Sequence, residues 1–191
     1  MSFNAVVSLL VLAVGFGLLI YSLISARPRK DWIQTYPSGR AVRPLDVRPE
    51  DVDIRDIAHH LSMLCRFAGA VQRFYSVAEH SVRVARRVWE LTECVRYTRK
   101  ATVHDAPEAY MVDVPSPLKR SWWMWGYRRA ERRAARAISA ALGVMRAEPL
   151  AVKAADTEIL GTEARQLKSP VHPEWRLPPV IKIPDGTAMV G

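Results

Sequence analysis

The chain has 191 residues, enough for one compact domain with an appendage but too few for two independent cores. Its 28 Lys and Arg residues outnumber 19 Asp and Glu, and the net charge of +9 favours anionic partners such as nucleotides, nucleic acid or an anionic membrane face. The two cysteines, Cys65 and Cys94, have neither C-x-x-C nor zinc-ribbon spacing, which argues against a disulfide framework or a thiolate metal site.

An uncharged apolar run occupies residues 5–25, AVVSLLVLAVGFGLLIYSLIS. As a helix, a run of this length is able to cross a bilayer core of about 30 Å. No basic residue precedes it and ARPRK follows it, so we expect a single-pass membrane anchor with the rest of the chain on the cytoplasmic side. A buried core helix or a wrongly assigned start codon are the alternatives.

The rest of the chain is predicted to be almost entirely helical. Residues 31–50 are rich in turn-forming residues. Apolar residues then recur at three- and four-residue spacing in five stretches, 51–67, 76–91, 93–105, 125–143 and 148–167. These predict an all-α bundle over residues 31–168, preceded by an anchor with its basic flank (1–30) and followed by an irregular, Pro-rich tail (169–191).

Helix ends are predicted from capping and breaking residues. Asp53 and Ser76 are placed as N-caps, and Glu79 stands three residues after Ser76 in a capping-box pattern. Pro107 disfavours helical geometry at the preceding residue, which predicts a helix end near Asp105.

Two surface features accompany the helix at 125–143. Its arginines, Arg128, Arg129, Arg132, Arg133 and Arg136, are expected to form a solvated face, with contact to anionic lipid or polyphosphate as the alternative. The aromatic cluster WWMWGY, residues 122–127, favours packing near a membrane or between subunits slightly over core packing. A homodimer or higher oligomer is therefore possible, and no stable nucleic-acid partner is expected.

Ligand-type residues fall on the apolar sides of three predicted helices: His80, His104 with Asp105, and Asp156. Singly, each is more often a hydrogen-bonded structural residue. Together, two buried carboxylates and two imidazoles indicate a compensating cation, because an unpaired buried carboxylate costs several kcal/mol. Such a donor set suits one divalent ion, Co, Mn, Zn or Mg.

The same residues resemble a known family. The pattern H…HD…D, with the stretches DIAHHLSMLCRF, FYSVAEHS, HDAPEAYMVDVPSPLK and VKAADTEILGTEARQL, resembles the HD-domain metal-dependent phosphohydrolases. Within them it is most similar to the YfbR-like 5'-deoxynucleotidases, including phage dATP triphosphohydrolases. The resemblance runs from about Trp32 to Leu167 and implies an all-helical HD-domain bundle.

The resemblance implies roles for the central residues. His80, His104, Asp105 and Asp156 match the ligands of one divalent metal. Glu108 matches the acid thought to orient or deprotonate the attacking water.

Residues around this centre match substrate contacts. Asp113 matches an acid near the sugar and phosphate, although Val112 stands where relatives often have Gly. Arg66 matches a substrate-contacting arginine, Phe67 an aromatic residue that packs on the sugar or base, and Lys119 lies where a basic residue meets phosphates. Phe67 as core and Lys119 as a solvated loop residue are equally good interpretations.

The resulting expectation is metal-dependent hydrolysis of (deoxy)nucleotide phosphate esters, by a 5'-nucleotidase or a dNTP triphosphohydrolase. One alternative is a membrane-tethered regulatory protein that binds nucleotides on the same scaffold without turnover. Another is an HD phosphodiesterase of signalling nucleotides.

Overall fold

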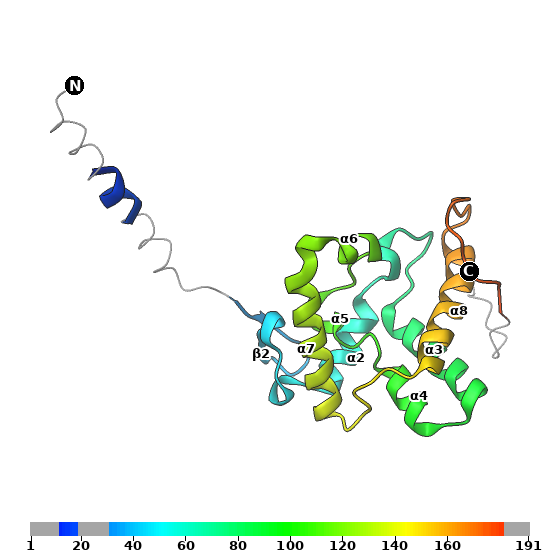
Figure 1. The fold of residues 1–191 in the computed structure, drawn as a ribbon. Helices are drawn as coiled ribbons and strands as arrows, with labels where there is room; N and C mark the ends of the chain where they lie inside the picture. Colours follow the sequence, from blue (N-terminus) through cyan, green and yellow to red (C-terminus); the bar gives the residue numbers. More distant parts are fainter. Residues whose placement is uncertain (1–11, 19–30, 182–191) are drawn as a thin grey trace. The chain divides into compact units, whose positions relative to one another are not determined.

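The computed structural model describes residues 12–18 and 31–181, and the chain divides into two units, Met1–Asp31 and Trp32–Gly191. In the second unit, α3 packs against α2, α4 and α8 (Figure 1). The predicted helical character is confirmed for the described part of this unit.

The structure does not support the predicted membrane span. Among the residues that the structure describes, no helix has both the length and the apolar character needed to cross a bilayer. Of residues 5–25, the structure describes 12–18 as helix, which rises only about 10 Å, and the rest of the run lies outside the described residues. The prediction of a single-pass membrane protein with a cytoplasmic catalytic domain is therefore wrong on the described residues.

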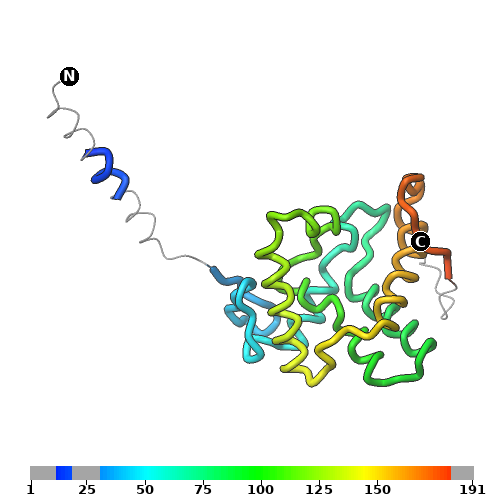
Figure 2. The backbone as a smooth tube through the Cα atoms, viewed as in Figure 1, coloured from blue at the N-terminus to red at the C-terminus, as the bar shows by residue number. Residues whose placement is uncertain are grey.

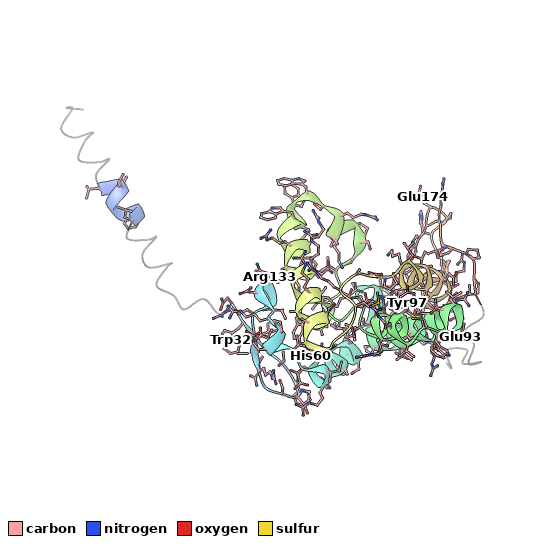
Figure 3. The ribbon with its side chains drawn as sticks, turned by 60° about the horizontal axis from the view of Figure 1, so that its bottom comes forward. Trp32, His60, Glu93, Tyr97, Arg133 and Glu174 are labelled. Carbon is pink, nitrogen blue, oxygen red and sulfur yellow. The ribbon has the colours of Figure 1, made fainter. Side chains whose placement is uncertain are left out.

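The turn-rich lead-in forms a small hairpin. Strands β1 (Ile33–Gln34) and β2 (Ala41–Val42) are antiparallel, with Ile33 opposite Val42, and two short 3-10 turns follow, η1 (Pro44–Asp46) and η2 (Pro49–Asp51). His60 fixes the hairpin, because its Nε2 accepts from the Tyr36 amide at 3.0 Å and its Nδ1 donates to the Ala109 carbonyl at 2.8 Å. Figure 3 labels Trp32 and His60 in this region.

Helices α2 (Ile54–Met63) and α3 (Val77–Thr92) begin where the capping residues predict. The Asp53 side chain accepts from the Arg55 amide. Ser76 and Glu79 form a reciprocal capping box, with the Glu79 amide 3.1 Å from Ser76 Oγ and the Ser76 amide 2.9 Å from Glu79 Oε2. Helix α2 ends at Met63, earlier than predicted, and η3 (Arg66–Gly69) follows it.

The next helices are shorter than the sequence pattern indicates. Helix α4 (Val95–Thr102) ends before His104 and Asp105, which lie in a turn that leads into α5 (Glu108–Met111). Helix α6 (Ser116–Arg120) and η4 (Trp122–Met124) then lead to α7 (Trp125–Ala141). Two residues beyond α7, Gly143 takes a φ of +60°, as expected after a helix end.

Helix α8 (Leu150–Leu167) completes the bundle, and the described part of the tail stays beside it (Figure 2). The Arg165 guanidinium donates to the carbonyls of Pro178 and Leu177, and the Ile181 amide donates to Thr162 Oγ1 at 3.2 Å. The tail is irregular, as predicted, over the residues that the structure describes.

Two clusters of buried side chains form the core of the described unit. Helices α2, α5 and α7 contribute to the first, together with the hairpin and Val77 at the start of α3. Helices α3, α4 and α8 form the second. Since α3 reaches both clusters, the side chains midway along it lie where the two meet.

Candidate metal centre

His80 is the most deeply placed residue of the centre, with no exposed surface. It lies between Val77 and Val84 on the buried side of α3, so both ring nitrogens need partners inside the protein. Nδ1 lies 3.0 and 3.1 Å from the two carboxylate oxygens of Glu163. Nε2 lies 3.3 Å from Asp156 Oδ1 and 3.6 Å from Asp105 Oδ2.

His104 and Asp105 reach the centre from the turn after α4. His104 Nδ1 lies 2.7 Å from the Ala101 carbonyl oxygen, which can only accept, so Nδ1 carries the hydrogen and Nε2 is left with a lone pair. That Nε2 lies 3.2 Å from Asp105 Oδ2. Ending α4 at Thr102 therefore turns both side chains inward to face His80.

One ligand atom from each of His80, His104 and Asp105 falls within 4.8 Å of the other two, a grouping able to hold a metal ion. Within the described residues, Nε2 of both histidines is buried and has no hydrogen-bond partner. Two such nitrogens facing one carboxylate fit a divalent cation, because imidazole nitrogen and carboxylate oxygen are ligands of Zn, Mn and Co. Asp156 joins this group through its contact with His80 Nε2 and lies outside the compact set of three.

Arg66 connects the carboxylates of the centre. Its Nη1 donates to Asp105 Oδ2 at 3.4 Å, and its Nη2 lies 3.6 Å from Glu163 Oε2. Burial acts to raise the pKa of Asp105, but His104, His80 and Arg66 outweigh it and hold that pKa well below its usual range. Asp105 is therefore a carboxylate at neutral pH.

Glu163 and Tyr75 are the residues that the sequence reasoning missed. Glu163 is fully buried and contacts His80, Arg66 and the Tyr75 hydroxyl, which donates to Oε1 at 2.5 Å. Burial acts to raise the pKa of Glu163, but His80 and Arg66 lower it overall. A signal existed, since Glu163 follows Asp156 by seven residues and so lies two turns away on the same face of α8.

Glu108 begins α5, one turn beyond the His104–Asp105 pair, and is 7% exposed. Burial and the charges of Asp105 and Asp113 raise its pKa to about 9 against the opposing effect of Arg66 and Lys119. Among the described residues its Oε2 has no hydrogen-bond partner. At neutral pH this carboxyl holds a proton, and a cation nearby would lower its pKa.

Val112 and Asp113 follow α5 in a constrained turn. Val112 has φ 61° and ψ 161°, a backbone region that is almost restricted to Gly. This is the position where the resembling family often has Gly. Asp113 is half-buried, and its charge acts on both Glu108 and Arg66.

Phe67 lies in a left-handed turn directly after Arg66. Phe67, Ala68 and Gly69 have φ values of 57°, 52° and 79°. The Phe67 ring lies 6.2 Å from the Trp175 ring of the tail, edge to face, and Lys168 Nζ lies 5.3 Å from its centroid. Phe67 is half-buried, so it belongs neither to the core nor to fully exposed surface.

Lys119 is paired inside the protein. Its Nζ lies 2.6 Å from Glu131 Oε1 on α7 and 5.9 Å from the centre of the Tyr127 ring. The structure therefore places this lysine in an ion pair, and its predicted contact with phosphate stays a prediction.

The comparisons with known proteins give a family. No protein-family model matches the chain. The uncharacterized protein YfdR of Escherichia coli K12 is 38% identical over 136 residues, which cover 71% of this chain and 72% of YfdR. The chain belongs to the YfdR family. A further relative of this YfdR-like chain, the uncharacterized protein RCAP_rcc00048 of Rhodobacter capsulatus, is 34% identical over 147 residues, 73% of this chain and 74% of that protein.

Neither YfdR nor its Rhodobacter relative has a description that names a reaction.

Proposed function

We propose that the protein is a divalent-metal-dependent phosphohydrolase that acts on nucleotide phosphate esters, as a 5'-nucleotidase or a dNTP triphosphohydrolase. The observation that supports it most is the grouping of His80, His104 and Asp105, in which the buried Nε2 of each histidine has no hydrogen-bond partner among the residues that the structure describes. The resemblance of the surrounding sequence to HD-domain phosphohydrolases supplies the reaction class.

The protein's residues can be assigned to steps of this reaction. A divalent ion held by the centre supplies polarisation of a phosphoryl oxygen and a lowered pKa for water. Glu108, which begins α5 one turn after Asp105, would accept a proton at its carboxylate once a bound cation has lowered its pKa, and would return that proton in a later step. Arg66, which pairs with Asp105, would hold an oxygen of the phosphate as charge accumulates on it.

The test uses the full chain, loaded in turn with Co, Mn, Zn or Mg. A panel of deoxynucleoside mono-, di- and triphosphates is followed for release of phosphate, pyrophosphate and tripolyphosphate. We expect hydrolysis of at least one class that stops when EDTA is added. Full metal occupancy without turnover on the whole panel would contradict the proposal and favour a regulatory protein.

A matched pair of variants places the activity at the centre. His104→Ala should lower the rate at least about a hundredfold, because it removes a predicted ligand. His172→Ala removes a histidine from the exposed tail and should leave the rate unchanged. Equal rates for both variants would move the activity away from this site.

A further inference from the structure

One side of α7 carries a strip of exposed positive charge. Trp125, Arg129, Arg132 and Arg136 are all exposed, and at 3.6 residues per turn they fall within an arc of about 60° along about 17 Å of helix. We call these four residues the α7 strip. Among the residues that the structure describes, none of its three guanidinium groups has a hydrogen-bond or ion-pair partner.

The neighbouring charged residues on α7 form hydrogen bonds and ion pairs within the protein. Arg128 Nη1 donates to the carbonyls of Lys119 at 2.6 Å and Ser121 at 2.8 Å. Arg133, labelled in Figure 3, pairs with Asp46. Glu131, the acidic residue of α7, forms an ion pair with Lys119. The strip is thus not part of the bonding that holds α7 in place.

Exposed aromatic rings gather at the N-terminal end of the strip. Trp122, Trp123 and Trp125 are 69%, 68% and 63% exposed. The rings of Trp122 and Trp123 have centroids 4.0 Å apart. Three large apolar side chains within four residues are seldom left in water without a partner.

The occupant of this surface has to be anionic and has to offer planar or apolar groups. A second copy of the chain fits poorly, because each copy carries +9 and would bring arginines against arginines. A lipid surface fits poorly too, because a helix that lies in the interface inserts an apolar face, and the apolar face of α7, with Ala130, Ala134 and Ile138, is buried in the core.

We propose that the α7 strip binds single-stranded nucleic acid. Arg129, Arg132 and Arg136 contact successive phosphates, and unstacked bases pack on the tryptophans at the start of the helix. Such sites combine a line of cations with aromatic platforms that accept any base. This binding is separate from the proposed hydrolysis and replaces the expectation of no stable nucleic-acid partner.

The test is fluorescence anisotropy of a fluorescein-labelled 20-mer of thymidylate, titrated with the full chain in EDTA so that the metal centre does not contribute. The triple variant R129Q/R132Q/R136Q should bind at least about tenfold more weakly. Its plot of log affinity against log salt should be shallower by about 2, because each single-strand phosphate contact contributes about 0.7. Trp125→Ala should weaken binding about tenfold at an unchanged slope.

The control variant R96Q/R146Q/R176Q removes three exposed arginines elsewhere and gives the same net charge. It should bind the oligonucleotide almost as the unmodified chain does. Equal weakening by both triple variants, or no binding by the unmodified chain, would overturn the proposal. So would strip-dependent sedimentation with phosphatidylcholine–phosphatidylserine vesicles (3:1) without oligonucleotide binding.

Discussion

The contacts of a single carboxylate, Glu163, decide how His80 is presented to a cation. Burial acts to lower the pKa of His80, but Glu163 raises it overall to about 9, so a cation that binds here has to displace the proton on Nε2. Because Glu163 is ionised and accepts from His80 Nδ1, the remaining hydrogen stays on Nδ1, and the freed lone pair of Nε2 faces Asp105 and Asp156. A carboxylate behind a ligating histidine fixes its tautomer and makes the ring a better donor. Tyr75 and Arg66 hold that carboxylate in turn.

Replacing Glu163 by Gln should therefore weaken metal binding while the fold persists. We expect the dissociation constant for Zn or Co, measured by calorimetric titration, to rise about ten- to a hundredfold. Tyr75→Phe removes one hydrogen bond from the same carboxylate and should have a smaller effect. The Co absorption spectrum gives a second readout, and an unchanged spectrum and affinity in Glu163→Gln would show that the residue is only structural.

A second prediction at this scale concerns Val112. A β-branched residue at φ 61° and ψ 161° carries strain of about 1–3 kcal/mol, which Gly avoids. Val112→Gly should raise the free energy of unfolding by about 1 kcal/mol in urea denaturation, because the entropy cost of Gly offsets part of the relief. Val82→Gly, on the exposed side of α3, should instead lower it by about 0.5 kcal/mol. A loss of stability in both variants would show that the backbone at Val112 is not strained.

Helix α8 contacts the metal centre on one face and the C-terminal tail on another. One face brings Asp156 and Glu163 to the centre, and Gly161 meets the tail, where an added Cβ would lie 2.8 Å from Pro178. The tail is therefore part of what positions α8.

Gly161→Ala should lower the midpoint of thermal unfolding, because neither the helix nor Pro178 can move away without losing the Arg165 and Thr162 contacts. Gly126 is the matched control, since it also lies in a helix but has nothing within 4 Å of the added Cβ. Gly126→Ala should raise stability by up to about 1 kcal/mol. Circular dichroism melts of both variants check the opposite signs.

Local signals were enough to predict several elements. Apolar spacing together with Asp53, Ser76 and Glu79 predicts the starts of α2 and α3, because capping involves residues three apart or fewer. The early end of α4 was not predictable from Pro107, which constrains only its own neighbour. The two-residue strands of the hairpin are too short to alternate visibly.

The ligand-type residues of the candidate site could be predicted from the sequence, because they lie among apolar residues of predicted helices. His80, His104 and Asp105 meet as expected, and Asp156 comes next to His80. The pairing of Lys119 with Glu131 depends on how the chain turns between α6 and α7, and that of Phe67 with Trp175 on segments far apart in the chain. Only the packing of the helices brings those segments together.

For the molecule as a whole, the centre ties separate segments to one another. His80 comes from α3, His104 and Asp105 from the turn after α4, and Asp156 from α8. A cation that binds them in the folded chain alone adds its binding energy to folding, about 2.7 kcal/mol at a hundred times its dissociation constant.

Metal removal should therefore lower the thermal unfolding midpoint. We expect the full chain to unfold several degrees lower in EDTA than with excess Zn or Co, as seen by calorimetry. Asp105→Asn should lose most of this difference, and His172→Ala should keep it. If the unmodified chain had the same thermal unfolding midpoint with and without metal, that would contradict metal binding at this centre.

The uneven burial of the centre also has a kinetic consequence. His80 is enclosed, while the Asp105 and Asp156 side chains remain 21% and 23% exposed. An ion that enters this centre would meet the carboxylates first and the inner imidazole last, and a nucleotide lying over those carboxylates would close the same route. Metal binding would then precede substrate binding, and a bound ion would exchange slowly during turnover. Which metal supports activity would depend on which one arrived first as much as on which one binds best.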